Sequence, residues 1–381
     1  MRTAIVIGGG IGGLSAAIGL RKAGWQATVV EQAPELTAVG AGITLWPNAV
    51  RALDELGLGP ALRPLLTTQP PAAIRDRRGR VLMEFGGASL ERLLGKPLVA
   101  LHRATLIALL RDALPAGSLR TGAEVAAVSR DGEITYRDGT GERADLVVGA
   151  DGINSTVRAS LWPEHAATVS AGYSAFRAVT RPRPGITLGT TLGPGTEFGT
   201  VPLVDGDLYW YASLAAPAGQ APGDVKAFLR QHLRDWPQPL RALVDDTPAD
   251  AILHHELRVL RRRLPHYVTG RVALLGDAAH AMTPFLGQGG CQAIEDAVVL
   301  AASLAGGTDT ADALARYDRE RRPRTRAIVA DSARMGALHN RPRHPLLIAV
   351  RNAILRGVPA SVTTRLAARP VRWSPPPITP R

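Results

Sequence analysis

The sequence predicts a mixed α/β fold in which an antiparallel sheet is inserted into a mainly parallel one and C-terminal helices follow. Three observations predict it. A glycine-rich turn separates two apolar strands within residues 1–31. Buried-strand patterns return far along the chain at residues 146–150 and 271–275. Between them, residues 166–267 contain alternating apolar and polar stretches, which are typical of antiparallel strands.

The first of these segments carries a nucleotide-binding pattern. Residues 3–7 form an apolar strand, and Gly8, Gly10 and Gly13 fill the G-x-G-x-x-G positions before a helix. These glycines allow a tight turn, a close approach of backbone amides to a pyrophosphate and close packing of helix on strand. Glu31 ends the second strand, where a carboxylate accepts hydrogen bonds from ribose hydroxyls and repels a 2′-phosphate. This Rossmann-like unit favours FAD or NAD over NADP; the alternative is a glycine turn that binds no ligand.

Composition limits the class of protein. The chain has 381 residues, enough for two domains, and no apolar run of about eighteen residues, so we expect no membrane-spanning helix. Cys291 is the only cysteine, which excludes an internal disulfide and favours a reducing cytoplasm. The net charge of +12 comes from arginines scattered without interleaved aromatic residues. We therefore expect anionic small molecules rather than nucleic acid as ligands, no membrane contact, and a monomer or homodimer.

The stretch after the second strand leads through a helix into a strand pair. Residues 40–45 follow that strand, and Pro47 opens a helix with apolar residues on one face. The pattern then predicts two strands at residues 73–76 and 81–85, joined by a tight turn. The next helix begins at Arg103.

Three further strands end at an acidic turn. Residues 124–128 and 133–136 form two of them, and residues 146–150 form a continuous apolar run, as a buried parallel strand requires. This run is followed by Asp151 and Gly152, at the carboxyl end where α/β sheets bind ligands.

The inserted segment gathers aromatic residues along its predicted strands. Tyr211 and Phe198 are candidates for the wall of a substrate pocket, with the core of the sheet as an equally good alternative. For Trp210 the core interpretation is favoured. The high density of aromatic residues on an inserted sheet is the observation that suggests a pocket.

The last third returns to the α/β pattern and ends in helices. A strand at residues 271–275 leads to Asp277, and a glycine-rich loop at 284–290 precedes a helix. A further helix covers about 311–340. Residues 346–356 form a basic amphipathic stretch, which we expect to dock against the protein's own fold; contact with a membrane surface is the alternative.

Three motifs follow one another along the chain: the glycine turn with Glu31, the Asp151-Gly152 pair, and Asp277 followed by the loop at 284–290. With these motifs in this order, the chain resembles the flavin-dependent aromatic hydroxylases, the single-component monooxygenases with the p-hydroxybenzoate hydroxylase fold. The resemblance covers about residues 1–340. Residues 39–48 (VGAGITLWPN) and 289–296 (GGCQAIED) are similar to the branch that includes urate hydroxylase, 3-hydroxybenzoate hydroxylase and zeaxanthin epoxidase. The resemblance implies a Rossmann-like FAD-binding domain with an inserted antiparallel substrate-binding sheet.

The implied domain organisation is discontinuous. Residues 1–70, 99–165 and 268–345 would form the FAD-binding domain, residues 71–98 and 166–267 the substrate-binding sheet, and residues 346–381 a C-terminal helix and extended tail.

The resemblance also implies roles for individual residues. Arg103 would contact FAD phosphate or ribitol, Val125 the adenine edge through its backbone, and Asp277 the ribitol hydroxyls. A surface arginine at a helix start and a structural cap are the respective alternatives for Arg103 and Asp277. The loop from Gly287 to Cys291 would offer backbone amides that stabilise negative charge on the reduced flavin. The residues expected to bind FAD are Gly8, Gly10, Gly12, Gly13, Glu31, Gln32, Gly42, Thr44, Arg103, Val125, Asp151, Asp277, Gly287, Gly289, Gly290 and Cys291.

Three polar or reactive residues also have structural interpretations. Asp151 would act partly by fixing Arg158, and a purely structural network is an equally good interpretation. His280 as a base is the weaker interpretation, and packing against the loop the stronger. Cys291 is best interpreted as a packing residue, because the sequence places no base beside it. No spacing of His, Cys and carboxylate residues indicates a metal site.

The expected substrate contacts are Phe198, Tyr211, Pro284 and Phe285. Urate hydroxylases place an aspartate directly after the proline that corresponds to Pro284, whereas this chain has Phe285. An apolar ring there argues against a small polar purine and favours a larger aromatic substrate.

The implied reaction is a monooxygenation. NADH or NADPH would bind transiently and reduce FAD, and a flavin hydroperoxide would hydroxylate an aromatic or other electron-rich small molecule. Three alternatives stay open: an FAD-dependent epoxidase of an isoprenoid or alkene, an FAD reductase that does not use dioxygen, and a flavin-binding regulator without turnover.

Overall fold

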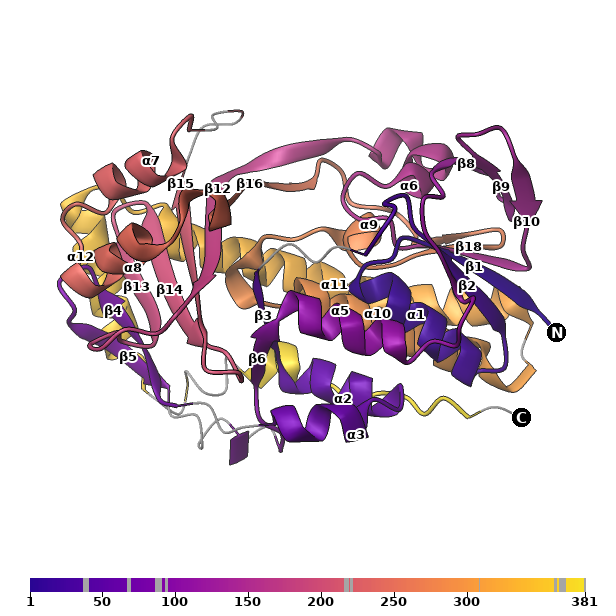
Figure 1. Ribbon diagram of the computed structural model, residues 1–381, viewed down its shortest axis with the longest axis horizontal. Helices are drawn as coiled ribbons and strands as arrows, with labels where there is room; N and C mark the ends of the chain where they lie inside the picture. Colours follow the sequence, from indigo (N-terminus) through magenta and orange to yellow (C-terminus); the bar gives the residue numbers. More distant parts are fainter. Residues whose placement is uncertain are drawn as a thin grey trace.

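The computed structural model describes residues 1–36, 41–66, 70–85, 91–92, 95–215, 219, 222–307, 309–359, 362 and 368–379. Val39 and Gly40, which open the motif at residues 39–48, lie outside the described residues. Two large sheets lie at opposite ends of the molecule, and helix α11 (Thr310–Asn340) runs from one to the other (Figure 1).

The first large sheet has six strands and is mainly parallel. Strand β1 lies between β11 and β2, so the first strand of the chain is central and buried. Only β17 runs antiparallel to its neighbour, β18. In spatial order, the strands are β17 (Val268–Thr269), β18 (Val272–Leu274), β11 (Leu146–Gly149), β1 (Thr3–Ile7), β2 (Gln26–Val30) and β7 (Leu119–Arg120).

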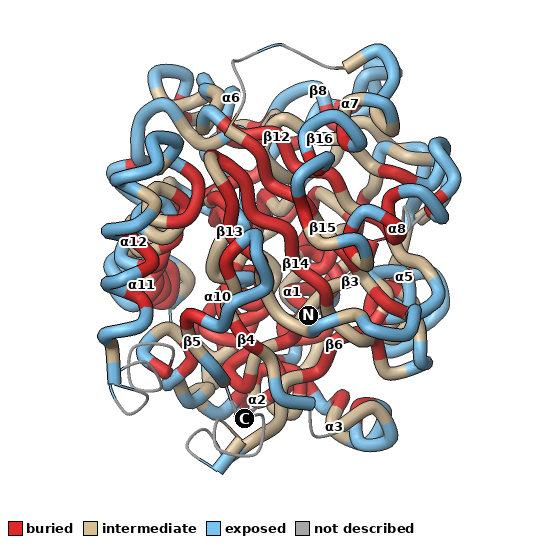
Figure 2. The backbone as a smooth tube through the Cα atoms, turned by 90° about the vertical axis from the view of Figure 1, so that its left-hand side faces the viewer, coloured by how far each residue is buried: buried red, intermediate tan, exposed pale blue. Residues whose placement is uncertain are grey.

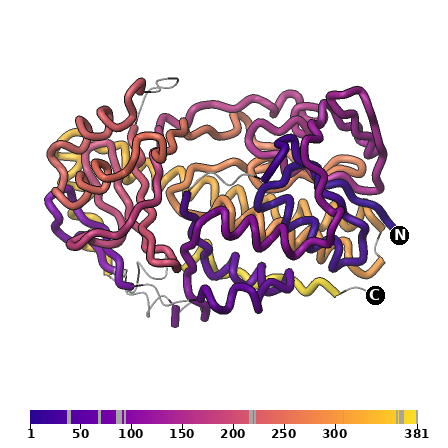
Figure 3. The backbone as a smooth tube through the Cα atoms, viewed as in Figure 1, coloured from indigo at the N-terminus to yellow at the C-terminus, as the bar shows by residue number. Residues whose placement is uncertain are grey.

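Helices α1 (Ile11–Lys22) and α10 (Gly289–Leu304) form the core of this half. Helix α10 is mostly apolar and buried over nearly its whole length. The two helices approach closely at Gly19, where an added Cβ would lie 2.9 Å from Ala301 Cβ. Segments from opposite ends of the chain therefore build one nucleotide-binding core, as Figure 3 shows by the orange helix beside indigo ones.

The second large sheet has seven strands and is antiparallel except where β13 runs parallel to β4. Two strands from before residue 90, β4 and β5, extend the edge of a sheet otherwise built from later residues (Figure 3). In spatial order, the strands are β16 (Leu253–Leu260), β12 (Thr168–Thr180), β15 (Leu208–Ala215), β14 (Thr196–Pro202), β13 (Gly189–Gly193), β4 (Ala72–Asp76) and β5 (Val81–Phe85).

One face of this sheet packs on helices α7 (Val225–His232) and α8 (Gln238–Asp246). Phe176 and Trp210 from the sheet meet Leu229 and Leu243 of the helices in a separate apolar core. Figure 2 shows the central strands β14 and β15 buried along most of their length.

Shorter elements complete the fold. Strands β3 (Gly42–Leu45) and β6 (Val99–His102) pair with each other, and a three-stranded sheet contains β10 (Gly141–Arg143), β9 (Glu133–Tyr136) and β8 (Val125–Val128). The remaining α-helices are α2 (Pro47–Glu55), α3 (Gly59–Leu62), α5 (Arg103–Asp112), α6 (Thr156–Leu161), α9 (Asp277–His280) and α12 (Pro345–Gly357). Short 3₁₀ helices lie at Arg63–Leu65, Pro163–His165, Ala249–Ala251, Pro284–Leu286, Ala305–Gly307 and Arg369–Val371.

Helix α12 presents a polar face to the protein. Its buried residues are Arg351, Asn352 and Leu355, whereas Leu346 and Val350 are at least half exposed. The stretch does dock on the fold, but through the guanidinium of Arg351, which donates to the carbonyl of Gly193 at 3.2 Å. Among the described residues, no helix combines the length and the apolar character that crossing a bilayer requires.

Candidate active site

A cavity of about 1420 Å³ is lined by residues that directly follow strands of the six-stranded sheet and by strand residues of the seven-stranded sheet. At one end it reaches Gly10 and Glu31, and at the other it reaches Tyr211 and Leu355. Asp277 and Gly287 line it between these ends. Gly10, Gly152 and Asp277, one from each of the three motifs on which the family resemblance rests, therefore face the same space.

The glycine turn gives the nucleotide end its shape. Gly8 has φ of 110°, and a Cβ on Gly13 would lie 1.9 Å from the Gly8 carbonyl oxygen, so both positions require glycine. Helix α1 begins just after Gly10 without a side-chain cap, and a Cβ on Gly10 would meet nothing within 4 Å. The first amides of a helix lack intrahelical partners, so an uncapped helix start beside open space suits a pyrophosphate.

Glu31 is held at the tip of β2 by the backbone. Its two carboxylate oxygens accept hydrogen bonds from the amides of Gly9, at 2.7 Å, and Ala33, at 2.9 Å. Each oxygen keeps acceptor capacity, and the residue lines the cavity, so its position fits a ribose.

The middle of the cavity combines a carboxylate with cations. Asp277 begins α9, Arg103 begins α5, and Arg177 lies on β12; all three line the cavity. Although Asp277 is exposed toward the cavity, the surrounding protein raises the pKa of this carboxyl by desolvation, and the nearby His280, Arg103 and Arg177 oppose that rise. A carboxylate in this setting is suited to hydrogen-bonding hydroxyl groups of a ligand.

The loop at residues 284–290 brings bare backbone to the cavity. Gly287 adopts a left-handed conformation with φ of 61°, and a Cβ there would lie 3.0 Å from Trp46 Nε1. Helix α10 begins at Gly289, again without a side-chain cap, and both Gly289 and Gly290 line the cavity. A helix start of this kind favours negative charge in front of it, as the reduced flavin ring would place there.

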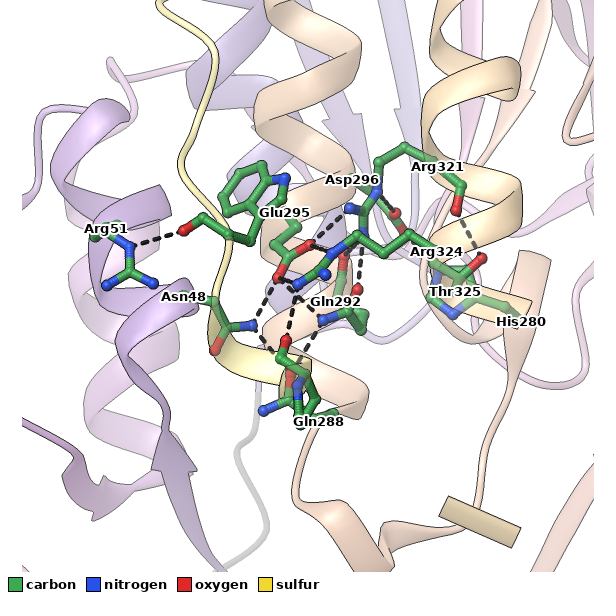
Figure 4. A network of polar contacts seen from close by, with 12 residues as sticks. Asn48, Arg51, His280, Gln288, Gln292, Glu295, Asp296, Arg321, Arg324 and Thr325 are labelled. Carbon is green, nitrogen blue, oxygen red and sulfur yellow. Dashed lines mark hydrogen bonds and ion pairs between the residues drawn. The ribbon is translucent and has the colours of Figure 1, made fainter. Parts of the chain in front are cut away.

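A buried polar network supports this loop from behind (Figure 4). The Arg321 guanidinium lies between Glu295 and Asp296, with N–O distances of 2.6 Å to each. Asn48 donates to Glu295 at 2.7 Å and to the side-chain oxygen of Gln288 at 3.0 Å. The network therefore ties the residue before α10 to helices α2 and α11.

The same network fixes the start of α9. Asp296 accepts a hydrogen bond from the Gly276 amide at 2.9 Å and lies 2.5 Å from His280 Nε2. Although burial alone would raise it, the pKa of Asp296 is held well below its usual range by His280 and Arg321. His280 is buried and does not line the cavity, which agrees with packing rather than catalysis.

Six of the residues expected to bind FAD do not line the cavity: Gly8, Gly13, Gln32, Val125, Asp151 and Cys291. The other ten line the cavity: Gly10, Gly12, Glu31, Gly42, Thr44, Arg103, Asp277, Gly287, Gly289 and Gly290.

Asp151 and Arg158 do not form an ion pair in the described part of the chain. Asp151 accepts from the Val157 amide at 3.1 Å, and burial raises its pKa. Arg158 instead donates to the carbonyl of Ala278 at 3.0 Å, next to Asp277. The expected fixing of Arg158 by Asp151 is therefore replaced by carbonyl contacts.

Cys291 is enclosed at the start of α10. Its sulfur lies 3.7 Å from the carbonyl oxygens of Thr44 and Gly287. Burial raises the pKa of the thiol to about 12, so it is neutral at ordinary pH. This agrees with a packing role.

The two aromatic candidates on the inserted sheet face in opposite directions. Gly199 pairs with Tyr211, and Phe198 pairs with Ala212, so Phe198 and Tyr211 fall on different faces. Tyr211 lines the cavity. Phe198 does not: it is 1% exposed and stacks on Trp210 in the core, with ring centroids 5.4 Å apart. The expectation that Phe198 lines the pocket is therefore corrected.

Pro284 and Phe285 line the cavity where the loop meets the inserted sheet. The Phe285 ring makes an edge contact with Tyr173, at 5.1 Å between centroids. It also lies so close to α11 that a Cβ on Gly336 would be 2.2 Å from the ring. Phe285 thus adds an apolar side chain to the cavity wall where the loop meets the inserted sheet.

Sequence reasoning missed several polar residues of the cavity. Glu197 of β14 and His339 of α11 meet at 2.7 Å, although 142 positions separate them and neither lies in a motif. Outside the cavity lining, His102, Asp205 and Asp207 bring their ligand atoms within 4.8 Å of one another, a grouping that spacing along the chain did not indicate. Only the pairing of distant elements reveals either group.

Comparison with known proteins agrees with this geometry. A family model described as an FAD binding domain matches residues 1–332. The chain is 38% identical to an aurachin C monooxygenase/isomerase of Stigmatella aurantiaca, over 88% of this chain and 89% of that protein. It is 35% identical to an FAD-dependent urate hydroxylase of Klebsiella oxytoca, over 86% and 87% respectively. Klebsiella pneumoniae HpxO, solved with FAD and uric acid, superposes with a TM-score of 0.90 at 30% identity, covering 97% of this chain and 96% of that one.

Proposed function

Because the chain belongs to the family of FAD-dependent aromatic hydroxylases, we propose that it hydroxylates an aromatic substrate that is larger and less polar than urate. The observation that carries this proposal is Phe285, whose ring lines the cavity between its nucleotide end and the inserted sheet. NADH or NADPH and dioxygen are the proposed co-substrates. FAD, when bound, supplies electron transfer from the nicotinamide and activation of dioxygen.

The proposed cofactor contacts follow from the cavity. The start of α1 at Gly10 would hold the pyrophosphate, Glu31 the ribose and Asp277 the ribitol hydroxyls. The amides of Gly289 and Gly290 would face the flavin ring. Residues that do not line the cavity, such as Gly13, would act by allowing the backbone to approach.

At the inserted sheet, the protein's task is to orient the substrate and exclude water. The wall there includes Met335, Leu338 and Leu355, which offer apolar contacts to a flat ring. Urate presents polar groups around its whole edge, and those that face these three apolar side chains would have no hydrogen-bond partner.

The test is a screen of phenols and fused aromatic hydroxyl compounds against the purified yellow protein. We expect a hydrophobic phenol to stimulate both NAD(P)H oxidation and oxygen uptake, because this family typically couples flavin reduction to ligand binding. Urate should not stimulate either. Coupled urate oxidation would contradict the inference from Phe285.

The same assay separates the remaining alternatives. NAD(P)H oxidation with an aromatic ligand but without oxygen uptake would identify a reductase, and an epoxide product from an alkene would identify an epoxidase. No oxidation with any ligand would favour a regulator. We further propose a cytoplasmic location, which the free and buried Cys291 supports. A monomer or homodimer is the proposed oligomeric state.

A further inference from the structure

A buried carboxylate lies on the substrate wall of the cavity. Glu197 is 4% exposed, yet it lines the cavity close to apolar residues of α11 and α12. A carboxylate removed from water is unfavourable unless it is paired and hydrogen-bonded. Each of the two carboxylate oxygens of Glu197 therefore needs a hydrogen-bond partner.

One oxygen has a firm partner. His339 Nδ1 lies 2.7 Å from Glu197 Oε2, and because an ionised carboxylate can only accept, the ring nitrogen donates. His339 is itself held in place, since its carbonyl accepts a hydrogen bond from Arg351 of α12 at 2.9 Å. The buried face of α12 therefore fixes the residue that orients Glu197.

The other oxygen is free to meet a ligand. Glu197 Oε1 accepts no hydrogen bond from the described residues, and directly across the β14–β15 pair lies Ser213. Ser213 also lines the cavity, is 2% exposed, and its hydroxyl has no partner among the described residues. Glu197 Oε1 and the Ser213 hydroxyl, on paired strands, therefore both lack a hydrogen-bond partner among the described residues.

The neighbouring tyrosine does not supply a charge there. The Tyr211 hydroxyl lies 3.2 Å from Thr190 Oγ1. Burial and the negative charge of Glu197 raise the pKa of Tyr211, so its phenol stays neutral. Several cations line the cavity, and Arg177 lies directly across the β12–β15 pair from Tyr211. Among the described residues, however, no lysine or arginine forms an ion pair with Glu197.

We propose that Glu197, oriented by His339, is the specificity-determining group for substrate at the far end of the cavity. It accepts a hydrogen bond from a phenolic hydroxyl or ring N–H of a neutral aromatic substrate. The same negative charge, in a poorly solvated site, disfavours aromatics that carry a carboxylate. This inference rests on the proposed function, which it deepens by naming the substrate class.

The test uses holoenzyme and three probes of one shape: 2-naphthol, 2-methoxynaphthalene and 2-naphthoate. Binding is followed by perturbation of the flavin absorbance, which does not depend on turnover. We expect 2-naphthol to bind at least tenfold more tightly than either other probe. Equal affinity for the three probes, or no binding of 2-naphthol, would overturn the proposal.

Variants then assign the preference to its residue. Glu197→Gln keeps the shape and removes the charge, so the preference for 2-naphthol over 2-naphthoate should fall at least tenfold. Glu133→Gln makes the same change at an exposed position of β9 and should leave that ratio unchanged. FAD content verifies folding of both. An unchanged ratio in Glu197→Gln would assign the preference elsewhere and contradict the proposal.

His339 is tested as a positioning residue by comparing two amides. The amide of His339→Asn can take the place of Nδ1 and should retain the ligand preference, whereas His339→Gln reaches toward Nε2 and should lose it. Equal loss in both would indicate that the residue only supports the fold. If the probes discriminate but none stimulates NAD(P)H oxidation, the site stands and the proposed hydroxylation fails.

Discussion

At the scale of single residues, the substrate wall depends on two glycines that lie under tyrosine rings. A Cβ on Gly199 would lie 2.1 Å from the Tyr211 ring, and a Cβ on Gly42 would lie 2.5 Å from the Tyr209 ring. Both tyrosines line the cavity. Their positions are thus set by the absence of a side chain on a neighbouring strand, as well as by their own contacts.

We therefore expect Gly199→Ala to displace Tyr211 and weaken substrate binding about tenfold or more, with FAD content unchanged. The reason is that a methyl group cannot fit under the ring without moving it. Ligand titration followed by flavin absorbance measures the effect. Gly223→Ala is the matched control, because an added Cβ there meets nothing within 4 Å. Wild-type affinity in Gly199→Ala would show that the ring position is unimportant.

The same residues show what sequence reasoning can and cannot reach. Alternation predicted antiparallel strands within residues 166–267, but which face of a strand meets the cavity depends on the pairing register. Tyr211 and Phe198 were equally good candidates until the pairing of Gly199 with Tyr211 separated them. Glu197 carried no signal at all, because its partner His339 comes from a distant helix.

At the scale of elements, helices α10 and α11 are joined by charges as well as by apolar packing. Arg321 is fully buried between Glu295 and Asp296. Burial alone would raise the pKa values of both carboxylates, but Arg321 and the neighbouring cations lower them. These lowered values mean that the network stabilises the fold above the unfolded-state pKa of about 4, and that this contribution is lost as pH falls through the folded-state values.

We expect Arg321→Met to lower the free energy of unfolding by about 3–5 kcal/mol at pH 7, because it leaves buried carboxylates unpaired. Urea unfolding measures the difference. Arg319→Met, on the exposed side of α11, should stay within about 0.5 kcal/mol of wild type. The difference in free energy of unfolding between wild type and Arg321→Met should become smaller toward pH 3 as the carboxylates become protonated. A difference that becomes larger in acid would contradict this account.

Elements were predicted well where their pattern is local, and less well where packing decides. The strand at 146–150 and the helix after residue 290 follow directly from apolar periodicity. Helix α12 was also expected, but its orientation was not: Arg351 faces inward while Leu346 and Val350 face outward. Periodicity alone favours burial of the apolar face. Here the Arg351 guanidinium is buried instead, because it donates hydrogen bonds to the carbonyls of Gly193 and His339.

At the scale of the whole molecule, cofactor and substrate would share one continuous space. Glu31 and Leu355, which lie at its opposite ends, line one and the same cavity. The convergence of the glycine turn, Asp277 and the loop at Gly287 was predictable, since each follows a recognisable motif. The far wall was not, because it is assembled from β4, β12, β14, β15 and α11 together.

The length of the cavity predicts a preference for the complete dinucleotide. FAD at a hundredfold excess over its Kd should add about 2.7 kcal/mol to the stability of the protein freed of cofactor. FMN lacks the adenosine half that Glu31 and the start of α1 would hold, so it should raise the melting temperature less at equal concentration. Differential scanning fluorimetry measures both. An equal shift would mean that the nucleotide end contributes nothing to binding.

The separation of the two large sheets also affects how this protein can change over time. Among the described residues, the six-stranded and seven-stranded sheets share no strand. New side chains on β14 or β15 can therefore remodel the chamber for a different ring system without shifting the register of β1, β2 or β11. Laboratory evolution directed at that chamber can broaden the range of accepted compounds while redox machinery inherited from the ancestor stays intact.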